Sequence, residues 1–282
     1  MPLVPVKDIL KCADENQFAA AAFDVFNFES ISWVVKAAEI EKVPVILMFY
    51  PDMKTFIPLS TLAAIANDVA RNAAVPVGVH LDHSRTFHDV MLGIPAGFQS
   101  IMFDGSARPF EENAAITRQV VESAHIMGVD VEAELGLVGS GSRKEDFMDD
   151  SLYTDPAFAK KFVEETNVDS LAVAIGNSHG HYVCEPHLDI KRLDEINRTI
   201  STPLVLHGGS GIPPEQVTES VKYGINKVNI GTEFFAKTKA AGAQALAEEN
   251  SWLGAMNKAG EEVIPFVRSR LQWLNPTEFR LP

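Results

Sequence analysis

Eight short apolar runs alternate with amphipathic helical stretches along this 282-residue sequence. The runs are rich in β-branched residues, as buried strands are, and the stretches between them repeat their apolar residues with helical spacing. Eight strand–helix units in series predict a (β/α)8 TIM barrel with parallel strands. An open doubly wound sheet is the alternative, but the sequence lacks the dinucleotide-binding fingerprint that would favour it. The expected strands are Ala20–Val25, Pro44–Phe49, Val75–Leu81, Phe98–Phe103, Val129–Glu134, Ser170–Ile175, Pro203–His207 and Lys227–Ile230.

A final helix, Leu253–Trp273, follows the eighth unit and is additional to the barrel. It packs either on its own barrel or against a second subunit. The protein is expected to form a homodimer or homotetramer. We therefore predict a single barrel domain over residues 1–282, with a C-terminal helical extension at about 253–274. The other expected helices are Glu29–Lys42, Leu59–Arg71, a short one near Phe87–Met91, Phe110–Met127, Ala157–Thr166, Ile190–Thr199, Pro214–Tyr223 and Glu233–Glu249.

The formal net charge of −14 argues against two classes of partner. An acidic surface repels nucleic acid and anionic lipid, so neither is expected to bind. An anionic substrate would need a local site of amides or cations. The two cysteines, Cys12 and Cys184, form no metal or redox motif and fit a reducing compartment. With no evident signal peptide or membrane-spanning run, a cytoplasmic location is expected.

Three expected strands end in a histidine-containing polar tip: Val-His-Leu-Asp-His83, Asn-Ser-His179-Gly and His207-Gly-Gly-Ser-Gly211. A parallel barrel brings such tips together on the face that carries the active site. Three neutral imidazoles would hold a zinc ion and leave one coordination position open for a substrate. The sequence therefore favours a metal-dependent enzyme.

The first of these tips contains two histidines, His80 and His83, and the strand pattern alone does not decide which of them faces the site. Along a regular strand, His80 and Asp82 face one way and Leu81 and His83 the other. At the end of the strand this alternation breaks, which allows the last residues to turn into the site. A carboxylate beside a metal-bound histidine suits proton transfer, whereas a buried histidine bonded to the backbone is the simpler interpretation. At the second tip, His181 is expected to be exposed.

Glycine-rich turns after the seventh and eighth strands predict a phosphate site. The turn after His207 offers free N–H groups, and Asn229-Ile-Gly-Thr232 leads into a helix N-terminus, where an anion is favoured. Phosphate sites of barrels often lie after strands 7 and 8. Two acids also end strands, Asp104 and Glu134, and each would hold a second cation, orient a ligand histidine, or serve only as a capping or salt-bridging carboxylate.

Taken together and in order, these motifs resemble the class II, zinc-dependent ketose-bisphosphate aldolases, fructose- and tagatose-bisphosphate aldolases among them. The matching segments are His-Leu-Asp-His, Glu-Ala-Glu-Leu-Gly, Ser-Leu-Ala-Val-Ala-Ile-Gly-Asn-Ser-His-Gly, Leu-Val-Leu-His-Gly-Gly-Ser-Gly and Lys-Val-Asn-Ile-Gly-Thr-Glu, and they span roughly residues 5–250. The resemblance implies a carbon–carbon lyase that makes or breaks a bond between dihydroxyacetone phosphate and an aldehyde.

The resemblance also implies roles for individual residues. His83, His179 and His207 would bind Zn²⁺, and Asp82 would donate the proton to the aldehyde oxygen. Asp104 and Glu134 would line a second metal position. A monovalent cation, Na⁺ or K⁺, is often found nearby. The residues implied to hold the dihydroxyacetone phosphate half are Gly180, Gly208, Gly209, Ser210, Asn229, Ile230, Gly231 and Thr232.

Two departures from the family pattern affect the other half of the substrate. The long polar connection Gly136–Thr154 is an expected lid, but it lacks the usual Gly-Gly before its acids, so Glu145 is the first candidate for its proton-transferring acid and Asp146 the second. Fructose-bisphosphate enzymes carry an aspartate where Gly231 stands. The aldehyde is therefore expected to be unphosphorylated or otherwise modified.

Two other functions are compatible with parts of the sequence. A Schiff-base aldolase in the same barrel would use Lys227, a lysine in the eighth strand, but would leave the three histidines without a purpose. A non-catalytic sugar-phosphate-binding barrel would keep the phosphate turns alone. The presence of Asp82 with all three histidines argues against it.

Overall fold

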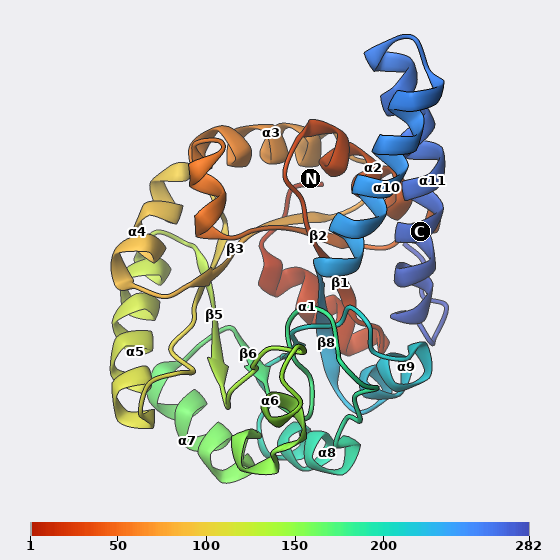
Figure 1. Ribbon diagram of the computed structural model, residues 1–282. Helices are drawn as coiled ribbons and strands as arrows, with labels where there is room; N and C mark the ends of the chain where they lie inside the picture. Colours follow the sequence, from red (N-terminus) through yellow and green to blue (C-terminus); the bar gives the residue numbers. More distant parts are fainter. Residues whose placement is uncertain (1, 282) are drawn as a thin grey trace.

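The computed structural model describes residues 2–281 and confirms the predicted barrel. Its strands are parallel and pair in chain order, and β8 closes the barrel onto β1 (Figure 1). The strands are β1 (Ala20–Asp24), β2 (Val45–Phe49), β3 (Val77–Ser84), β4 (Ser100–Phe103), β5 (Asp130–Leu135), β6 (Ser170–Val173), β7 (Leu204–Leu206) and β8 (Ile225–Ile230).

Helices surround this barrel, and most of them match the expected ones within one or two residues. Those that pack around the strands are α2 (Phe28–Glu41), α3 (Leu59–Asn72), α4 (Phe87–Ala96), α5 (Phe110–Ile126), α7 (Pro156–Thr166), α8 (Ile190–Thr199), α9 (Pro214–Lys222) and α10 (Thr232–Glu248). The apolar layer between strands and helices forms one continuous buried cluster. Helix α4 is longer than expected because Gly93 and Pro95 lie within it rather than ending it. A side chain at position 93 would collide with Leu81, so the glycine allows the helix to approach β3.

An N-terminal helix, α1 (Val6–Asn16), was not predicted. Its apolar residues pack against the inward-facing residues of β1 and β2, namely Ala20, Ala22, Ile46 and Met48, in a separate buried cluster. Gly78 of β3 leaves room for this packing, since a Cβ there would lie 2.8 Å from Val6. The helix therefore closes the barrel at the end opposite the strands' carboxyl ends.

The last helix, α11 (Trp252–Trp273), packs on α10 and on α2 of its own chain. Gly260 brings α11 so close to α2 that a Cβ would lie 2.6 Å from the indole nitrogen of Trp33. Helices α10 and α11 run together past the edge of the barrel (Figure 1). Within residues 2–281, none of the helices has the length and apolar character to cross a bilayer.

Candidate metal and substrate site

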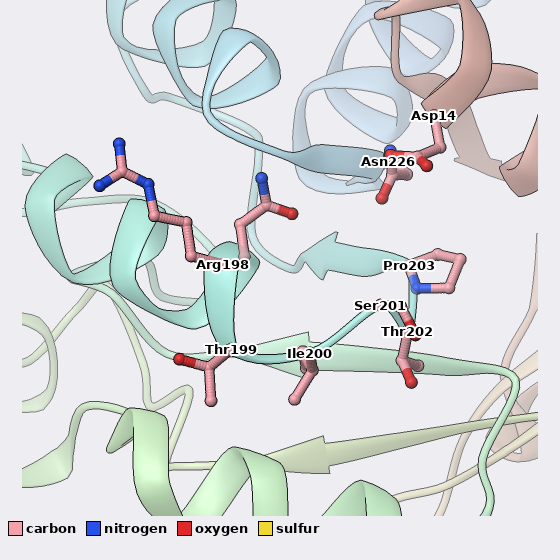
Figure 2. A pocket seen from close by; sticks show the side chains of 9 residues that line it. Asp14, Arg198, Thr199, Ile200, Ser201, Thr202, Pro203 and Asn226 are labelled. Carbon is pink, nitrogen blue, oxygen red and sulfur yellow. The ribbon is translucent and has the colours of Figure 1, made fainter.

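The barrel has a cavity at each end, and they differ in chemistry. At the amino ends of the strands, a cavity of about 530 Å³ lies between the α8–β7 connection and Asn226 (Figure 2). Its two charged residues already have partners: Asp14 accepts a hydrogen bond from Asn226, and Arg198 pairs with Asp194. At the carboxyl ends, a cavity of about 800 Å³ is lined by His83 and His179, and the predicted active-site face is therefore the better candidate.

His83 reaches this cavity because β3 becomes irregular at its end. The register between β3 and β4 shifts between Leu81 and Ser84, and the backbone of His83 has φ +46°. Such a conformation is uncommon for a residue other than glycine and often marks a functional position. His80 lies before the shift and Asp82 within it, and both side chains are buried. The predicted break in alternation at the strand end is confirmed.

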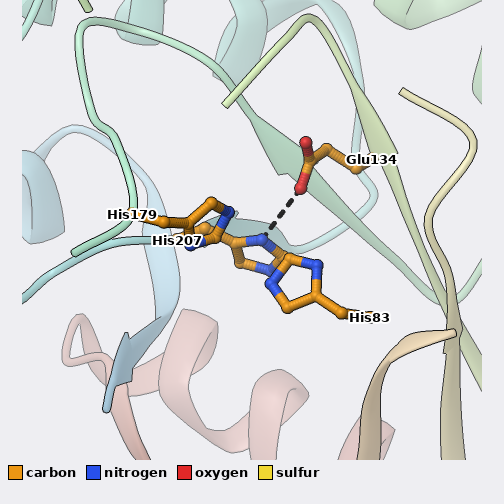
Figure 3. A group of neighbouring side chains, drawn as sticks. All are labelled: His83, Glu134, His179 and His207. Atoms are coloured by element: carbon orange, nitrogen blue, oxygen red, sulfur yellow. Dashed lines mark ion pairs between the residues drawn. The ribbon is translucent and has the colours of Figure 1, made fainter. Parts of the chain in front are cut away.

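Three histidines from three strand ends meet at this face. His179 follows β6 and His207 follows β7. The ring of His83 lies 4.7 Å from each of the other two rings, between centroids, and those two rings lie 5.7 Å apart. One ligand atom from each histidine and one from Glu134 all lie within 4.8 Å of one another (Figure 3). Residues distant in the chain thus form a four-membered set of metal-ligand type. His181 is exposed, as expected.

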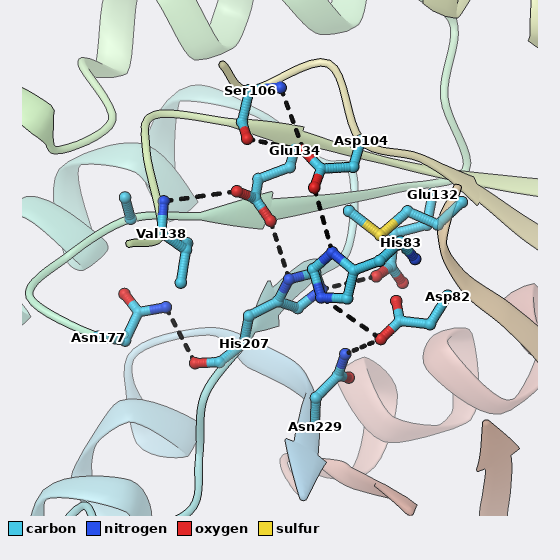
Figure 4. A network of polar contacts seen from close by, with 12 residues as sticks. Asp82, His83, Asp104, Ser106, Glu132, Glu134, Val138, Asn177, His207 and Asn229 are labelled. Atoms are coloured by element: carbon cyan, nitrogen blue, oxygen red, sulfur yellow. Dashed lines mark hydrogen bonds and ion pairs between the residues drawn. The ribbon is translucent and has the colours of Figure 1, made fainter. Parts of the chain in front are cut away.

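Acids contact two of these histidines. Glu134 Oε2 lies 2.9 Å from His207 Nδ1, and Asp104 Oδ2 lies 3.2 Å from His83 Nδ1 (Figure 4). Asp104 is itself held by hydrogen bonds from the backbone and hydroxyl of Ser106. Each acid therefore touches a different histidine, and Asp104 has the geometry of a group that orients an imidazole.

The three imidazoles have different proton affinities. Burial disfavours the charged form of His207, but its contacts with Glu132 and Glu134 outweigh burial and raise its pKa to about 10. For His83, burial is likewise outweighed, by Asp82 and Asp104, and the pKa is raised. Burial and the charges of His83 and His207 lower the pKa of His179 to about 3. His179 is thus neutral at physiological pH, the state in which an imidazole binds a metal, whereas His83 and His207 would release a proton when a metal binds.

Asp82 lies beside this set with its carboxylate fixed. Its Oδ2 accepts a hydrogen bond of 3.0 Å from Asn229 Nδ2 and lies 3.6 Å from His83 Nε2. Burial alone would raise its pKa, but the charge of His83 and the contact with His80 hold the pKa well below the ordinary value. Asp82 is therefore ionised and able to accept a proton.

A buried ionic network, which the sequence did not reveal, lies beneath the histidines. Lys227 Nζ binds both carboxylate oxygens of Glu132, at 2.7 and 2.9 Å, and Glu132 Oε1 lies 3.0 Å from His207 Nε2. His80 Nδ1 lies 2.8 Å from the hydroxyl of Ser100. His80, Asp82 and Glu132 form a second set with metal-ligand spacing, but the Lys227 ammonium already supplies a cation there. The alternation of Glu132 with Glu134 along β5 was the available signal that both face inward.

The predicted phosphate turns lie at the same end of the barrel, and several of their amides hold the turns together. The N–H of Gly209 donates to Asn229 O, and the N–H of Gly211 donates to Glu233 Oε1. Gly208 has φ +61°, and a Cβ there would overlap the carbonyl oxygen of Ser178. Helix α10 begins at Thr232 with no side-chain cap from Gly231. The N–H of Glu233, in the first turn of this helix, donates to Ser210 Oγ. This N–H and those of Gly209 and Gly211 are therefore not among the free N–H groups expected from the sequence.

The lid, residues 136–154, covers the cavity from the side of His179. It contains the short helix α6 (Glu145–Met148) and a turn of 3-10 helix at Asp150–Leu152. Its backbone bonds to His179 on both sides, from His179 N to Gly139 O and from Gly141 N to His179 O. Asp146 lines the cavity and is held by Ser140 N and Arg143, which lower its pKa, whereas Glu145 is exposed.

Comparison with known proteins gives one consistent result. Residues 4–278 match the family model described as class II fructose-bisphosphate aldolase. The sequence is 38% identical over 273 residues to a probable fructose-bisphosphate aldolase of Bacillus subtilis (strain 168), covering 94% of this chain and 95% of that protein. The crystal structure of the YdjI aldolase from Escherichia coli K12 is similar, with a TM-score of 0.87, 33% identity and coverage of 96% of this chain and 97% of that one. A putative fructose-1,6-biphosphate aldolase from Coccidioides immitis follows, at TM-score 0.84 and 27% identity, with 96% of each chain covered.

Proposed function

Because the chain belongs to the class II fructose-bisphosphate aldolase family, we propose that it is a zinc-dependent aldolase acting on dihydroxyacetone phosphate and an aldehyde. The observation that carries this proposal is the meeting of three imidazoles beside an ionised aspartate at the catalytic face. Membership of the family makes the protein an aldolase. The metal, the ketose phosphate and the residue roles that follow are part of the proposal.

The donor set fits a zinc ion. His207 Nδ1 and Glu134 Oε2 are both buried and lie 2.9 Å apart as an ion pair, but the contact lacks hydrogen-bond geometry, and within residues 2–281 neither atom makes another hydrogen bond. Polar atoms left this way in a protein interior are costly unless another group binds them. Three imidazole nitrogens with one nearby carboxylate are ligands that zinc prefers, and they leave a position open. His83, His179 and His207 would hold the ion, and Glu134 with Asp104 would line a second position.

Zinc bound there would polarise the ketone carbonyl of the substrate and stabilise the negative charge that develops when the carbon–carbon bond breaks. The protein supplies the proton transfer. In the cleavage direction, the ionised Asp82 takes the proton from the hydroxyl group that becomes the aldehyde, and in condensation it returns this proton. The hydrogen bond from Asn229 holds the carboxylate in place for this step.

The dihydroxyacetone phosphate half would bind between the turns after β6, β7 and β8. Gly180, Gly208, Ser210 and Thr232 present backbone and hydroxyl groups there, and the N-terminus of α10 favours the negative charge of the phosphate. A monovalent cation, Na⁺ or K⁺, would lie near the same turns. The remaining residues proposed for this half are Gly209, Asn229, Ile230 and Gly231.

On the lid, we assign proton transfer at the nucleophilic carbon to Glu145 and a structural role to Asp146. Hydrogen bonds from Ser140 and Arg143 occupy Asp146 and keep it ionised. Glu145 is exposed on α6 and would reach the cavity when the lid closes over a substrate.

A Schiff-base mechanism is disfavoured by the surroundings of Lys227. Its ammonium group is enclosed in the barrel, fully buried, and bonded to both oxygens of Glu132. A nucleophilic lysine needs an unprotonated amine that a substrate ketone can reach. A non-catalytic sugar-phosphate-binding barrel is the remaining alternative, and the kinetic test below separates it from an enzyme.

The test follows release of dihydroxyacetone phosphate from a panel of phosphorylated ketoses. We expect a chelator to abolish cleavage and added zinc to restore it. Replacing Asp82 with alanine should keep zinc and phosphate binding while lowering kcat by about 100- to 10,000-fold, the usual contribution of a general acid or base. Cleavage that survives complete zinc removal, or an unchanged rate in D82A, would contradict the proposal.

A further inference from the structure

Asp24 places a carboxyl group at the catalytic end of β1 that none of the roles above uses. The residue is partly exposed, but its Oδ1 is buried and has no hydrogen-bond partner within the described part of the chain. The charge of Asp82 acts on it, which places the two carboxyl groups in one electrostatic neighbourhood. Burial and Asp82 raise the pKa of Asp24 to about 7. Among residues 2–281, no donor therefore holds Oδ1 of this carboxyl group.

The position of Asp24 depends on a glycine in the neighbouring strand. Ala22 pairs with Asn229 and Phe23 with Ile230, so Asp24 and Gly231 follow at the same level of the barrel. A Cβ at position 231 would overlap Asp24 Oδ2. Asp24 thus occupies the space into which a side chain at position 231 would project, and only glycine there permits this.

A second unsatisfied acceptor lies next to this space. Asn229 is two residues before Gly231 and faces the same side of β8. Its amide nitrogen is bonded to Asp82, which leaves its Oδ1 buried and without a partner among residues 2–281. Asp24 Oδ1 and Asn229 Oδ1 are thus two buried acceptors, on the neighbouring strands β1 and β8, that lack hydrogen-bond donors. A hydroxyl group is a donor that a sugar-like substrate can bring to both.

The substrate half that meets Asp24 follows from its neighbours. Asp82 serves the oxygen of the aldehyde carbon under the proposed function, and Asp24 is the adjacent carboxyl. Its charge also acts on Tyr50, which lines the cavity at the end of β2. Asp24 is therefore close enough to interact electrostatically both with Asp82 and with a residue that lines the cavity.

We propose that Asp24 accepts a hydrogen bond from the hydroxyl group on the carbon next to the aldehyde carbonyl, and that it determines specificity for 2-hydroxyaldehydes. This inference rests on the proposed function and names the class of its second substrate. Asn229, which is also proposed to contact the dihydroxyacetone phosphate half, offers Oδ1 as the other acceptor for the same hydroxyl group.

The test compares two aldehydes that differ in this hydroxyl group alone, glyceraldehyde in both enantiomers and 3-hydroxypropanal. Each is condensed with dihydroxyacetone phosphate by the zinc-loaded enzyme, and kcat/KM for the aldehyde is measured. We expect the wild type to prefer one enantiomer of glyceraldehyde. Above pH 7, where Asp24 is ionised, Asp24→Ala should reduce kcat/KM for that enantiomer roughly tenfold or more beyond any reduction with 3-hydroxypropanal, since a hydrogen bond to a charged group contributes about this much.

Gly231→Ala provides an independent route to the same result. Its methyl group would displace the Asp24 carboxyl. As a single substitution, it should therefore lower the ratio of kcat/KM for the preferred glyceraldehyde enantiomer to kcat/KM for 3-hydroxypropanal. In the D24A background it should lower the ratio little further, because the two changes act through one contact. Asp24→Asn keeps the side chain's shape and an acceptor oxygen, and it should fall between wild type and D24A. Zinc content and melting temperature of each variant separate this effect from misfolding.

Three outcomes would overturn the inference. Equal losses with both aldehydes in D24A and D24N would make Asp24 a positioning residue without contact to the hydroxyl group. An unchanged ratio would remove it from the site. A loss that higher Na⁺ or K⁺ reverses would assign the two acceptors to a cation. None of these outcomes affects the proposed function. That function fails if no aldehyde serves the wild-type enzyme as a substrate for condensation with dihydroxyacetone phosphate.

Discussion

The two sides of the catalytic cavity are built from different parts of the chain. The turns after β6, β7 and β8 are shaped by backbone, with glycines and main-chain hydrogen bonds such as Gly209 to Asn229. The opposite side, after β2 to β5, presents charged side chains that pair with one another, as Lys54 does with Asp89 and Arg143 with Asp146. A backbone site suits a constant group such as a phosphate, whereas paired side chains can vary without disturbing the fold. We infer that the first side binds the common substrate half, and that the second side, together with Asp24 at the end of β1, selects the aldehyde.

The largest effect that would sharpen this contrast is expected on the lid. Glu145→Gln removes the proposed proton carrier and should lower kcat by about 100-fold or more, with the melting temperature unchanged because the side chain is exposed. Asp146→Asn should instead lower the stability of the lid, since it loses the ionic contacts with Arg143. Steady-state kinetics and thermal unfolding measure both. A larger loss of kcat in a normally stable D146N would reverse the two roles.

A smaller effect is expected from the backbone side. Gly208→Ala places a methyl group against the carbonyl oxygen of Ser178 and forces the turn to move. Because misplacing a binding group by about 1 Å can cost about 100-fold, we expect kcat/KM for dihydroxyacetone phosphate to fall by roughly 10- to 100-fold. Gly180→Ala is the matched comparison: it has φ +86° but open space around it. If both variants lost equally, backbone strain alone, and not the shape of the turn, would explain the result.

The smallest effect concerns the support of the phosphate turn by α11. Arg270 binds Glu233 Oε2 at 2.6 Å, and Glu233 Oε1 accepts the N–H of Gly211. Arg270→Ala should raise the KM for dihydroxyacetone phosphate by about two- to fivefold with little change in kcat, as expected for a partly exposed ion pair. Arg268 is on the same helix as Arg270 and forms a similar ion pair with Glu41 of α2, away from the turn. Arg268→Ala is therefore the matched control. An equal rise of KM in R268A would mean that α11 acts only through overall stability.

Much of this fold and site could be predicted from the sequence because strand ends carry their own signal. Apolar runs that stop at His83, His179 and His207 predicted both the barrel order and the meeting of the three side chains. The same logic did not reveal α1, because a helix before the first strand has no place in the repeating strand–helix pattern.

Contacts between distant strands could not be predicted in the same way. Glu132 and Lys227 look like ordinary strand residues until the barrel closes and brings them together. Asp24 ends an alanine-rich strand, and its environment depends on the space that Gly231 leaves open on β8. The first contact arises from closure of the barrel and the second from the register of β8 against β1, and local sequence encodes neither.

The central claim is that one zinc ion binds the three strand-end histidines. Anomalous diffraction at the zinc absorption edge from crystals of the zinc-loaded protein tests it most directly. We expect a single strong peak at about 2.0–2.1 Å from a ring nitrogen of each of His83, His179 and His207. A peak centred instead on His80, Asp82 and Glu132, or none near these imidazoles in an active crystal, would contradict it.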